Sequence, residues 1–272
     1  ETLTLDPKSP ILLFDTGVGG LTVHAALREL LPDAPVIYAA DYAGLPYGEK
    51  TEAEVAARVA GLLGRMAERW HPRLVCIACN TASTIALGMV REVLEIPIVG
   101  TVPAIKPAAS ATTSETFALI GTNATIRQTY VDDLEAQFGN GKRLIRIAAP
   151  ELVDLAEAKL RGEPIKMDAI EAVSARLQDK SEGAPIDCLV LACTHFPLLA
   201  QEFSDVFGAE IKLIDGARGI ARRIAHLTQG HYFIRTGPDR FVTTGALERT
   251  HGLTKALGER GFGAVESFAS SA

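Results

Sequence analysis

The chain has 272 residues, of which 47% are hydrophobic, and this is enough for one large packed α/β domain or two smaller ones. Its formal net charge is −6 and no run of Lys or Arg stands out, so a polyanion such as nucleic acid is not an expected partner. No stretch approaches about 18 consecutive apolar residues, and the opening residues lack the basic start and apolar middle of a signal peptide. These features predict a folded cytoplasmic protein that does not engage a membrane.

The N-terminal part of the chain alternates short apolar runs with helical patterns. Its clearest helix is 51–70, where Thr51 and Glu54 form a capping box, acidic residues come early and arginines come late. Strands are expected at 11–15, 35–41, 73–78 and 96–100, with further helices at 21–30 and from about residue 81.

The same alternation continues in the C-terminal part. Strands are expected at 117–121, 143–149, 186–192 and 211–215, and helices at 123–137, 151–161, 165–179, 196–207 and 217–227. The segment 231–245 is expected to form a pair of strands around its Gly-Pro-Asp turn, followed by a last helix. Strands that alternate with helices predict parallel sheets covered on both faces.

Two blocks of the sequence repeat in the same order. In each half, a strand, a polar glycine-containing turn and a helix precede an Ala-Cys pair at the end of another strand. Phe14 lies 65 residues before Cys79, and Ile120 lies 73 residues before Cys193. This spacing indicates an internal duplication and predicts two pseudo-symmetric α/β lobes with mainly parallel sheets. The active site is expected beyond the carboxyl ends of the strands, in the cleft between the lobes.

Two of the four cysteines are candidate catalysts. Cys79 and Cys193 each end a strand and precede a helix start. Backbone N–H groups and the positive end of a helix dipole lower a thiol pKa at such a position, so both thiols are expected to be reactive. Cys76 and Cys188 lie inside apolar runs and are interpreted as core residues.

Other uses of these cysteines fit less well. Cys76 and Cys79 have the spacing of a thiol redox pair, but a redox motif normally opens a helix and here the intervening residues continue a strand. Cys76, Cys79, Cys193 and His195 have the number and the types of side chains that a zinc site needs. Residues three apart in a strand point to opposite faces, which disfavours that site, so no metal is expected.

A glycine turn follows the first strand. Asp15 ends this strand and precedes a turn with three glycines in four positions, which lets the backbone approach a ligand closely and leaves a helix N-terminus free for an anion. The full dinucleotide fingerprint is absent, so the turn does not predict a nucleotide site. His195, two residues after Cys193, is placed to handle a proton beside that thiol.

Uncharged polar residues gather at the same strand ends. Because these short motifs contain no Lys or Arg, their side chains would form a neutral hydrogen-bonding cradle for a small carboxylate. With a thiol on each side, one sulfur can remove a proton from a carbon while the other delivers one to the opposite face. The residues of this cradle are Thr16, Asn80, Thr81, Thr122, Thr125 and Thr194.

A series of motifs extends from about residue 11 to residue 268: FDTGVGGLTV, LPYGEK, ACNTAS, TVPAIKPA, IGTNATI, LACTHFPLL, FVTTG and VESF. Together they resemble the glutamate racemases of the cofactor-independent aspartate/glutamate racemase family. The resemblance implies interconversion of L- and D-glutamate without pyridoxal phosphate, metal or any other cofactor, with D-glutamate supplied to peptidoglycan synthesis. It also implies a homodimer and a second lobe inserted in the first, with residues 1–99 and 212–272 in one lobe and 100–211 in the other.

The resemblance also assigns site residues. The catalytic cysteines of the family match Cys79, acting on the D-isomer, and Cys193, acting on the L-isomer. Asp15 would assist Cys79, while His195 and Glu157 would assist on the other side. The matched substrate-binding positions are Asp15, Thr16, Tyr47, Gly48, Asn80, Thr81, Thr122, Thr125, Thr194 and His195. Thr16 replaces the usual serine of the family and keeps its hydroxyl, and the loop around Tyr47 is a candidate lid.

The residues themselves leave other functions open. An aspartate racemase, or another amino-acid racemase of the same family, would use the same thiols, and no residue indicates the length of the substrate side chain. A single-thiol hydrolase or decarboxylase on a related fold would need only one of the two cysteines. A regulatory or binding protein without catalysis would need neither of them.

Overall fold

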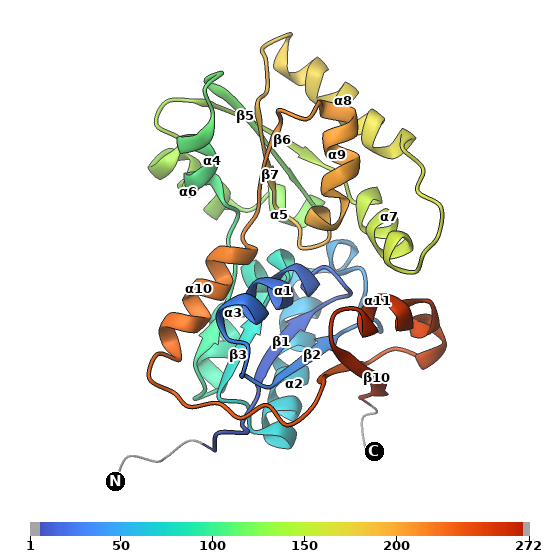
Figure 1. Cartoon of the computed structure of the whole chain (residues 1–272). Helices are drawn as coiled ribbons and strands as arrows, with labels where there is room; N and C mark the ends of the chain where they lie inside the picture. The colour runs from blue at the N-terminus through green and yellow to red at the C-terminus, as the bar shows by residue number, and fades with distance from the viewer. Residues whose placement is uncertain (1–5, 269–272) are drawn as a thin grey trace.

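The computed structural model describes residues 6–268, which fold into two α/β lobes, each built on its own sheet (Figure 1). The larger sheet has six strands in the order β10-β9-β2-β1-β3-β4, and the smaller has four in the order β6-β5-β7-β8. All of these strand pairs run parallel. The predicted fold class is therefore confirmed.

The two sheets share one topology. The order β2-β1-β3-β4 in the first lobe and β6-β5-β7-β8 in the second both place the first strand of the lobe next to its second and third strands. Strands β9 and β10 extend the larger sheet on the β2 side. This matching order is what an internal duplication predicts, and it makes β3 and β7 equivalent strands.

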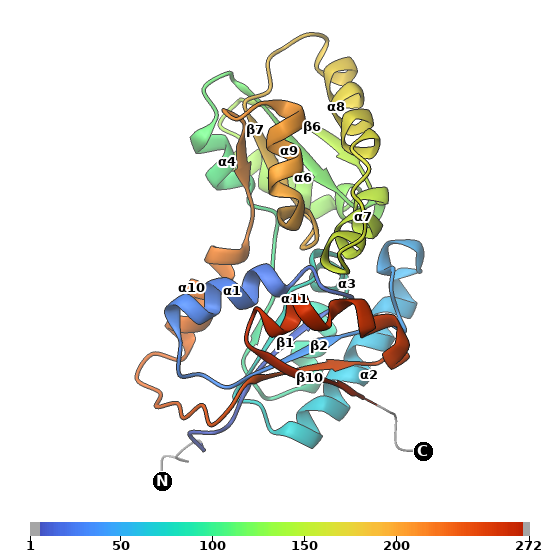
Figure 2. The same cartoon turned by 45° about the vertical axis from the view of Figure 1, so that its right-hand side comes forward.

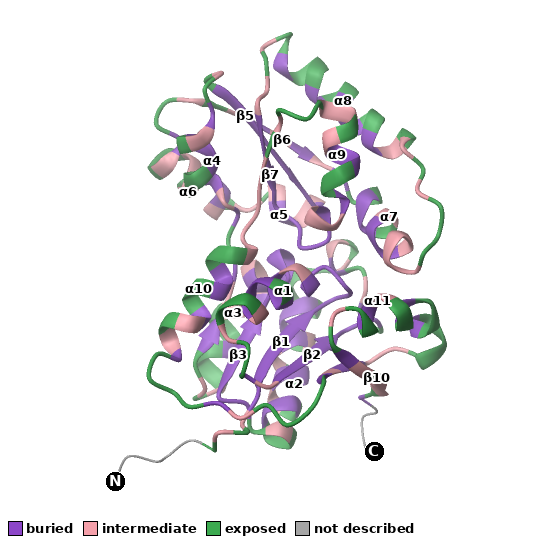
Figure 3. Ribbon diagram, viewed as in Figure 1, coloured by how far each residue is buried: buried purple, intermediate pink, exposed green. Residues whose placement is uncertain are grey.

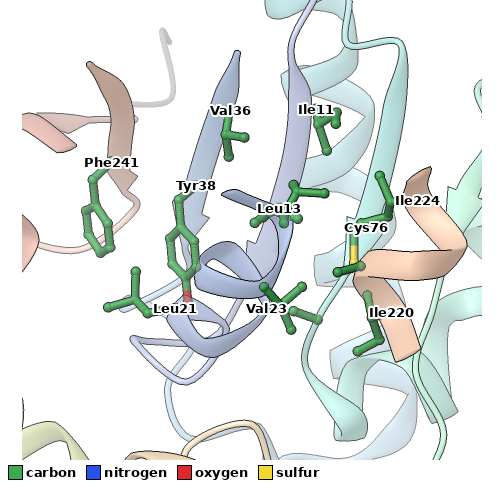
Figure 4. Packing of buried hydrophobic residues seen from close by; sticks show 14 of the residues in the cluster. Ile11, Leu13, Leu21, Val23, Val36, Tyr38, Cys76, Ile220, Ile224 and Phe241 are labelled. Atoms are coloured by element: carbon green, nitrogen blue, oxygen red, sulfur yellow. The ribbon is translucent and has the colours of Figure 1, made fainter. Parts of the chain in front are cut away.

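Helices cover both faces of the six-stranded sheet. In β1 (Ile11–Asp15), Ile11 and Leu13 share a buried cluster with α1 (Leu21–Leu30) and α10 (Ala217–Leu227). The alternate residues pack instead with α2 (Glu52–Trp70) and α3 (Asn80–Val93). Figure 4 shows part of the first cluster, with Val23 of α1 and Ile220 of α10 against the sheet. The remaining elements of this lobe are β2 (Val36–Ala40), β3 (Leu74–Ile77), β4 (Ile98–Val99), β9 (Asp239–Thr243), β10 (Phe262–Ser267), α11 (Thr254–Gly258) and the 3₁₀ helices η1 (Tyr47–Glu49) and η3 (Leu247–Leu253).

The four-stranded sheet is covered in the same way. Ala118 and Ile120 of β5 (Thr116–Gly121) pack with α7 (Glu151–Leu160), α8 (Asp168–Ser181) and α9 (Ala200–Phe207). The alternate residues, Phe117 and Leu119, pack with α4 (Ile105–Ala111) and α6 (Thr129–Phe138). The remaining elements are β6 (Arg143–Ala148), β7 (Cys188–Leu191), β8 (Lys212–Ile214), α5 (Asn123–Ile126) and the 3₁₀ helix η2 (Phe196–Leu199).

The chain passes between the lobes twice. It leaves the first lobe after β4 and returns into α10, and Figures 1 and 2 show both connections near that helix. Residues 212–214 form β8 and pair with β7, so sheet membership puts the return after Ile214 and not near Lys212. We therefore propose that the inserted lobe extends from about residue 100 to residue 214.

Some predicted elements differ in detail. The capping box of Thr51 and Glu54 is confirmed, but the helix predicted at 123–137 is divided into α5 and α6. The strand pair predicted at 231–245 is wrong, because only Asp239–Thr243 joins the sheet, and it pairs parallel with β2 and β10 on its two sides. Because β9 already has a hydrogen-bonded strand on each side, the residues before it form hydrogen bonds outside the sheet. The Ile234 N–H donates to the Pro7 carbonyl, and Arg73 donates to the Tyr232 carbonyl.

Burial follows this layered plan. Figure 3 shows buried residues concentrated in both sheets and exposed residues on the outward surfaces of the helices. Over residues 6–268, no helix has the length and apolar character that a membrane crossing requires.

Candidate active site

The turn between β1 and α1 lies against the second lobe. A Cβ atom at Gly17 would collide with the Glu157 carboxylate of α7, and one at Gly19 would lie 2.6 Å from the backbone nitrogen of His195. Only glycine lets the backbone approach the other lobe this closely. The glycines were predicted to face a ligand, whereas in this closed arrangement they face predicted site residues of the second lobe.

Asp15 lies at the carboxyl end of β1 and is fully buried. Its Oδ1 accepts hydrogen bonds from the Thr16 backbone N–H at 2.6 Å and from the Thr16 hydroxyl at 3.3 Å. Its Oδ2 is buried and accepts no hydrogen bond from the residues that the structure describes. Burial raises the pKa of Asp15, although the positive charge of His195 opposes this change. The carboxyl is thus a stronger base than an exposed aspartate.

Cys79 precedes a helix, as predicted, and is the N-cap residue of α3, which begins at Asn80 and not at about residue 81. Its sulfur accepts a hydrogen bond from the Ala82 N–H at 3.4 Å. The prediction of a lowered pKa is wrong for this thiol: burial, followed by the nearby Asp15 carboxylate, raises the pKa of Cys79 well above its usual value. The field at the helix N-terminus is therefore weaker than the loss of solvation and the negative neighbour.

Cys193 lies two residues beyond β7, in a chain of hydrogen bonds. His195 Nδ1 lies 3.9 Å from the Cys193 sulfur, and His195 Nε2 lies 2.7 Å from Glu157 Oε1. Burial lowers the pKa of His195, but its bonds to Cys193 and Glu157 outweigh burial and raise the pKa well above its usual value. Burial by itself would raise the pKa of Glu157, but the groups that donate hydrogen bonds to its carboxylate outweigh burial, so the pKa of Glu157 is lowered. The pair is thus an imidazolium and a carboxylate, with the imidazolium next to the thiol.

The first lobe supplies two further donors to Glu157. The Val18 backbone N–H donates to Oε1 at 2.9 Å, and the Tyr42 hydroxyl donates to Oε2 at 2.5 Å. Sequence reasoning missed Tyr42, which lies two residues beyond β2. The rule that ligands and site residues gather beyond the carboxyl ends of strands would have included it, although tyrosine in a loop is not by itself a signal.

A line of threonine hydroxyls joins the lobes at another point. Thr81 Oγ1 and Thr122 Oγ1 lie 3.1 Å apart, and Thr122 Oγ1 lies 3.2 Å from Thr125 Oγ1. Asn80 and Thr194 line a cavity of about 20 Å³ beside Cys193. A cavity of this size holds about one water molecule. The polar side chains predicted to bind a ligand therefore come from both lobes, but in this structure they bond to one another and leave little space beside Cys193.

The loop around Tyr47 is tied to the first lobe. The Tyr47 hydroxyl donates to Asp41 Oδ2 at 2.5 Å, and Arg58 donates to both oxygens of that carboxylate at 2.6 Å. Gly48 faces Thr122 of the second lobe. Sequence reasoning missed Asp41 and Arg58, whose contact joins residues of a loop and a helix and has no local pattern.

The two remaining cysteines are buried core residues, as predicted. Cys76 belongs to the apolar cluster under α1 and α10, and Cys188 belongs to the cluster under α4 and α6. No group of three or more His, Cys, Asp or Glu side chains within residues 6–268 is arranged to hold a metal ion.

The close approach of the glycine turn generates a prediction. Gly19→Ala places a methyl group against Thr194 and His195, so we expect the lobes to be held apart. Peptide-resolved alkylation should then modify Cys79 and Cys193, each 7% exposed in the closed structure, at least severalfold faster than in the unmodified chain. The matched control is Gly61→Ala in α2, where a Cβ atom meets no atom within 4 Å and alanine favours the helix. Equal alkylation rates in both variants would show that the turn does not control closure.

The sequence is similar to those of known proteins. Residues 21–224 match the Asp/Glu/hydantoin racemase family. The glutamate racemase of Sphingopyxis alaskensis is 55% identical over 262 residues, which cover 96% of this chain and 98% of that protein.

The fold is similar to those of solved glutamate racemase structures. The crystal structure of Escherichia coli glutamate racemase in complex with L-glutamate and the activator UDP-MurNAc-Ala has a TM-score of 0.88 at 38% identity, covering 96% of this chain and 98% of that one. The Thermus thermophilus glutamate racemase in complex with β-chloro-D-alanine has a TM-score of 0.70 at 33% identity, covering 97% and 98% of the two chains. From its sequence and its fold together, the chain belongs to the aspartate/glutamate/hydantoin racemase family.

Proposed function

We propose that this amino-acid racemase acts on glutamate and interconverts its L- and D-isomers with two thiols and no cofactor. The observation that carries the proposal is the equivalent placement of Cys79 beyond β3 and Cys193 beyond β7, each buried where the lobes meet. Each thiol has its own acid–base partners, Asp15 on one side and His195 with Glu157 on the other. The substrate assignment draws on the glutamate racemases that this chain is similar to.

The chemistry requires one proton transfer on each face of the α-carbon. With L-glutamate, the Cys193 thiolate takes the α-proton, so that the C–H bond breaks and its electron pair stays on the carbon. The Cys79 thiol then donates its proton to the opposite face, which gives D-glutamate and a Cys79 thiolate. In the reverse direction the two sulfurs exchange roles. The carbanionic transition state is stabilised by neutral hydrogen-bond donors in a site that excludes water.

The surroundings of the two thiols suit the starting state for L-glutamate. The Nδ1 atom of the His195 imidazolium lies 3.9 Å from the Cys193 sulfur, which places a positive charge beside the sulfur that acts as the base. The raised pKa of Cys79 keeps that thiol protonated and ready to donate. For D-glutamate the opposite state is needed, and the raised pKa of Asp15 makes its carboxylate a suitable base for Cys79.

Substrate entry requires the lobes to separate. The cavity of about 20 Å³ beside Cys193 is far too small for an amino acid with ten heavy atoms. Thr16, Asn80, Thr81, Thr122, Thr125 and Thr194 are all buried in this state, and opening would expose them to the carboxylates of the substrate. Tyr47 and Gly48 would then close over the bound molecule as part of the lid.

The cellular role follows from the substrate. D-glutamate is a building block of peptidoglycan, and we propose that the enzyme supplies it in the cytoplasm, as a homodimer.

The substrate is tested by incubating the protein with L-glutamate in deuterated water without added cofactor, while optical rotation is followed. We expect rotation to fall to zero and deuterium to enter the α-position. L-aspartate under the same conditions should react much more slowly. Change with L-aspartate but not with L-glutamate would assign the enzyme to the other amino acid, and change with neither would contradict the proposal.

The two-thiol mechanism gives a separate prediction. Cys79→Ser and Cys193→Ser should each lower the racemisation rate by about 10²- to 10⁴-fold, because each removes one of the two acid–base groups. The two variants should differ in which isomer still exchanges its α-proton with solvent. Cys188→Ala, which changes a core cysteine away from the site, is the control and should retain activity. Normal racemisation in both serine variants would exclude the mechanism.

A further inference from the structure

The Tyr42 hydroxyl contacts a site residue across the lobe boundary. Tyr42 lies just beyond β2 in the first lobe and is buried, and its hydroxyl donates to Glu157 Oε2 at 2.5 Å. Glu157 Oε1 in turn faces His195 and, through it, Cys193. One phenol of the first lobe is therefore connected, through two side chains of the second lobe, to a reacting sulfur.

Arg249 also contacts Tyr42. The Arg249 guanidinium donates to the Tyr42 carbonyl at 3.2 Å, and its central carbon lies 5.8 Å from the centre of the tyrosine ring. Burial, followed by the negative charge of Glu157, raises the pKa of Tyr42 far above its usual value, although Arg161 opposes this shift. The phenol therefore acts only as a neutral hydrogen-bond donor.

The hydrogen bonds of Glu157 depend on closure. His195 belongs to the same lobe as Glu157 and can stay bonded when the lobes separate, whereas Val18 and Tyr42 belong to the other lobe. The Tyr42 hydroxyl bonds to Oε2, so it opposes rotation of the carboxylate and helps to keep Oε1 directed at His195. Without that bond, the carboxylate is oriented by the remaining contacts of Oε1 with Val18 and His195 and is less firmly directed at the histidine.

We propose that Tyr42 is a positioning residue that couples lobe closure to the Cys193 side of the reaction by fixing the Glu157 carboxylate against His195. The proposal rests on the proposed racemase function and adds a residue that acts on one of the two proton transfers. The Tyr42 hydroxyl donates its hydrogen bond to Glu157, so its effect on Cys193 passes through Glu157 and His195.

The test compares Tyr42→Phe with Tyr130→Phe. Tyr130 lies in α6 of the second lobe and accepts a hydrogen bond from the Thr84 hydroxyl of α3 at 3.0 Å, so both variants lose a phenol hydroxyl from an interlobe bond. Of these two tyrosines, Tyr42 is the one bonded to Glu157. Tyr42→Phe should lower kcat/KM about ten- to a hundredfold, because the bond that it removes is to a charged group. The loss must be equal in both directions, since mirror-image isomers have an equilibrium constant of one.

The primary deuterium isotope effect on kcat/KM separates positioning from general damage. In Tyr42→Phe, transfer at Cys193 becomes more rate-limiting, so the isotope effect should rise with α-deuterated L-glutamate and fall with the D-isomer. Tyr130→Phe should leave both isotope effects as they are in the unmodified enzyme. Isotope effects in Tyr42→Phe that stay unchanged, or that shift in the same direction for both isomers, would overturn the proposal.

A second readout does not depend on the substrate. With iodoacetamide at neutral pH, the ratio of alkylation at Cys193 to alkylation at Cys79 should fall severalfold in Tyr42→Phe and stay unchanged in Tyr130→Phe. The ratio cancels any general opening of the lobes, which would expose both thiols. An unchanged ratio in Tyr42→Phe would contradict the positioning role, whereas a failure of the unmodified protein to racemise glutamate would contradict the proposed substrate alone.

Discussion

The structure of the site depends on one buried carboxylate, that of Glu157, held between two lobes. A charged carboxylate that is removed from water costs several kcal/mol unless hydrogen-bond donors replace its hydration. Glu157 has donors from both lobes: His195 from its own lobe, and Val18 and Tyr42 from the other. Closure therefore supplies hydrogen-bond donors to this charge and, at the same time, brings together the groups that we propose to be acids and bases.

The two thiols are equivalent in the fold but not in their surroundings. Burial, followed by the Asp15 carboxylate, raises the pKa of Cys79, whereas Cys193 lies beside the His195 imidazolium. In the proposed mechanism each sulfur acts as the acid for one isomer and as the base for the other, so the unequal surroundings suit the two thiols to opposite starting roles. The glycine turn lets the two lobes approach this closely, since any side chain at Gly17 or Gly19 would separate them.

Much of this could be predicted from the sequence. Regular alternation of apolar runs with amphipathic helices defined the two parallel sheets, and the repeated Ala-Cys motif at strand ends located both thiols. Contacts between distant residues could not be predicted, because a hydrogen bond from Tyr42 to Glu157 or from Arg58 to Asp41 has no local signature. The raised pKa of Cys79 was missed for the same reason: a helix N-terminus is visible in the sequence, whereas the depth of burial and the approach of Asp15 are not. The segment before β9 was misjudged because its turn signal did not show that both edges of β9 were already occupied.

In the proposed reaction one thiol from each lobe acts on opposite faces of the same carbon atom. A crystal structure of the unmodified chain with glutamate bound would show whether the two thiols take these positions. We expect the Cys79 and Cys193 sulfurs to lie on opposite faces of the α-carbon, each about 3–3.5 Å from it, with Glu157 still bonded to Val18 and Tyr42. A bound glutamate whose α-carbon meets only one sulfur, or meets both from the same face, would contradict it.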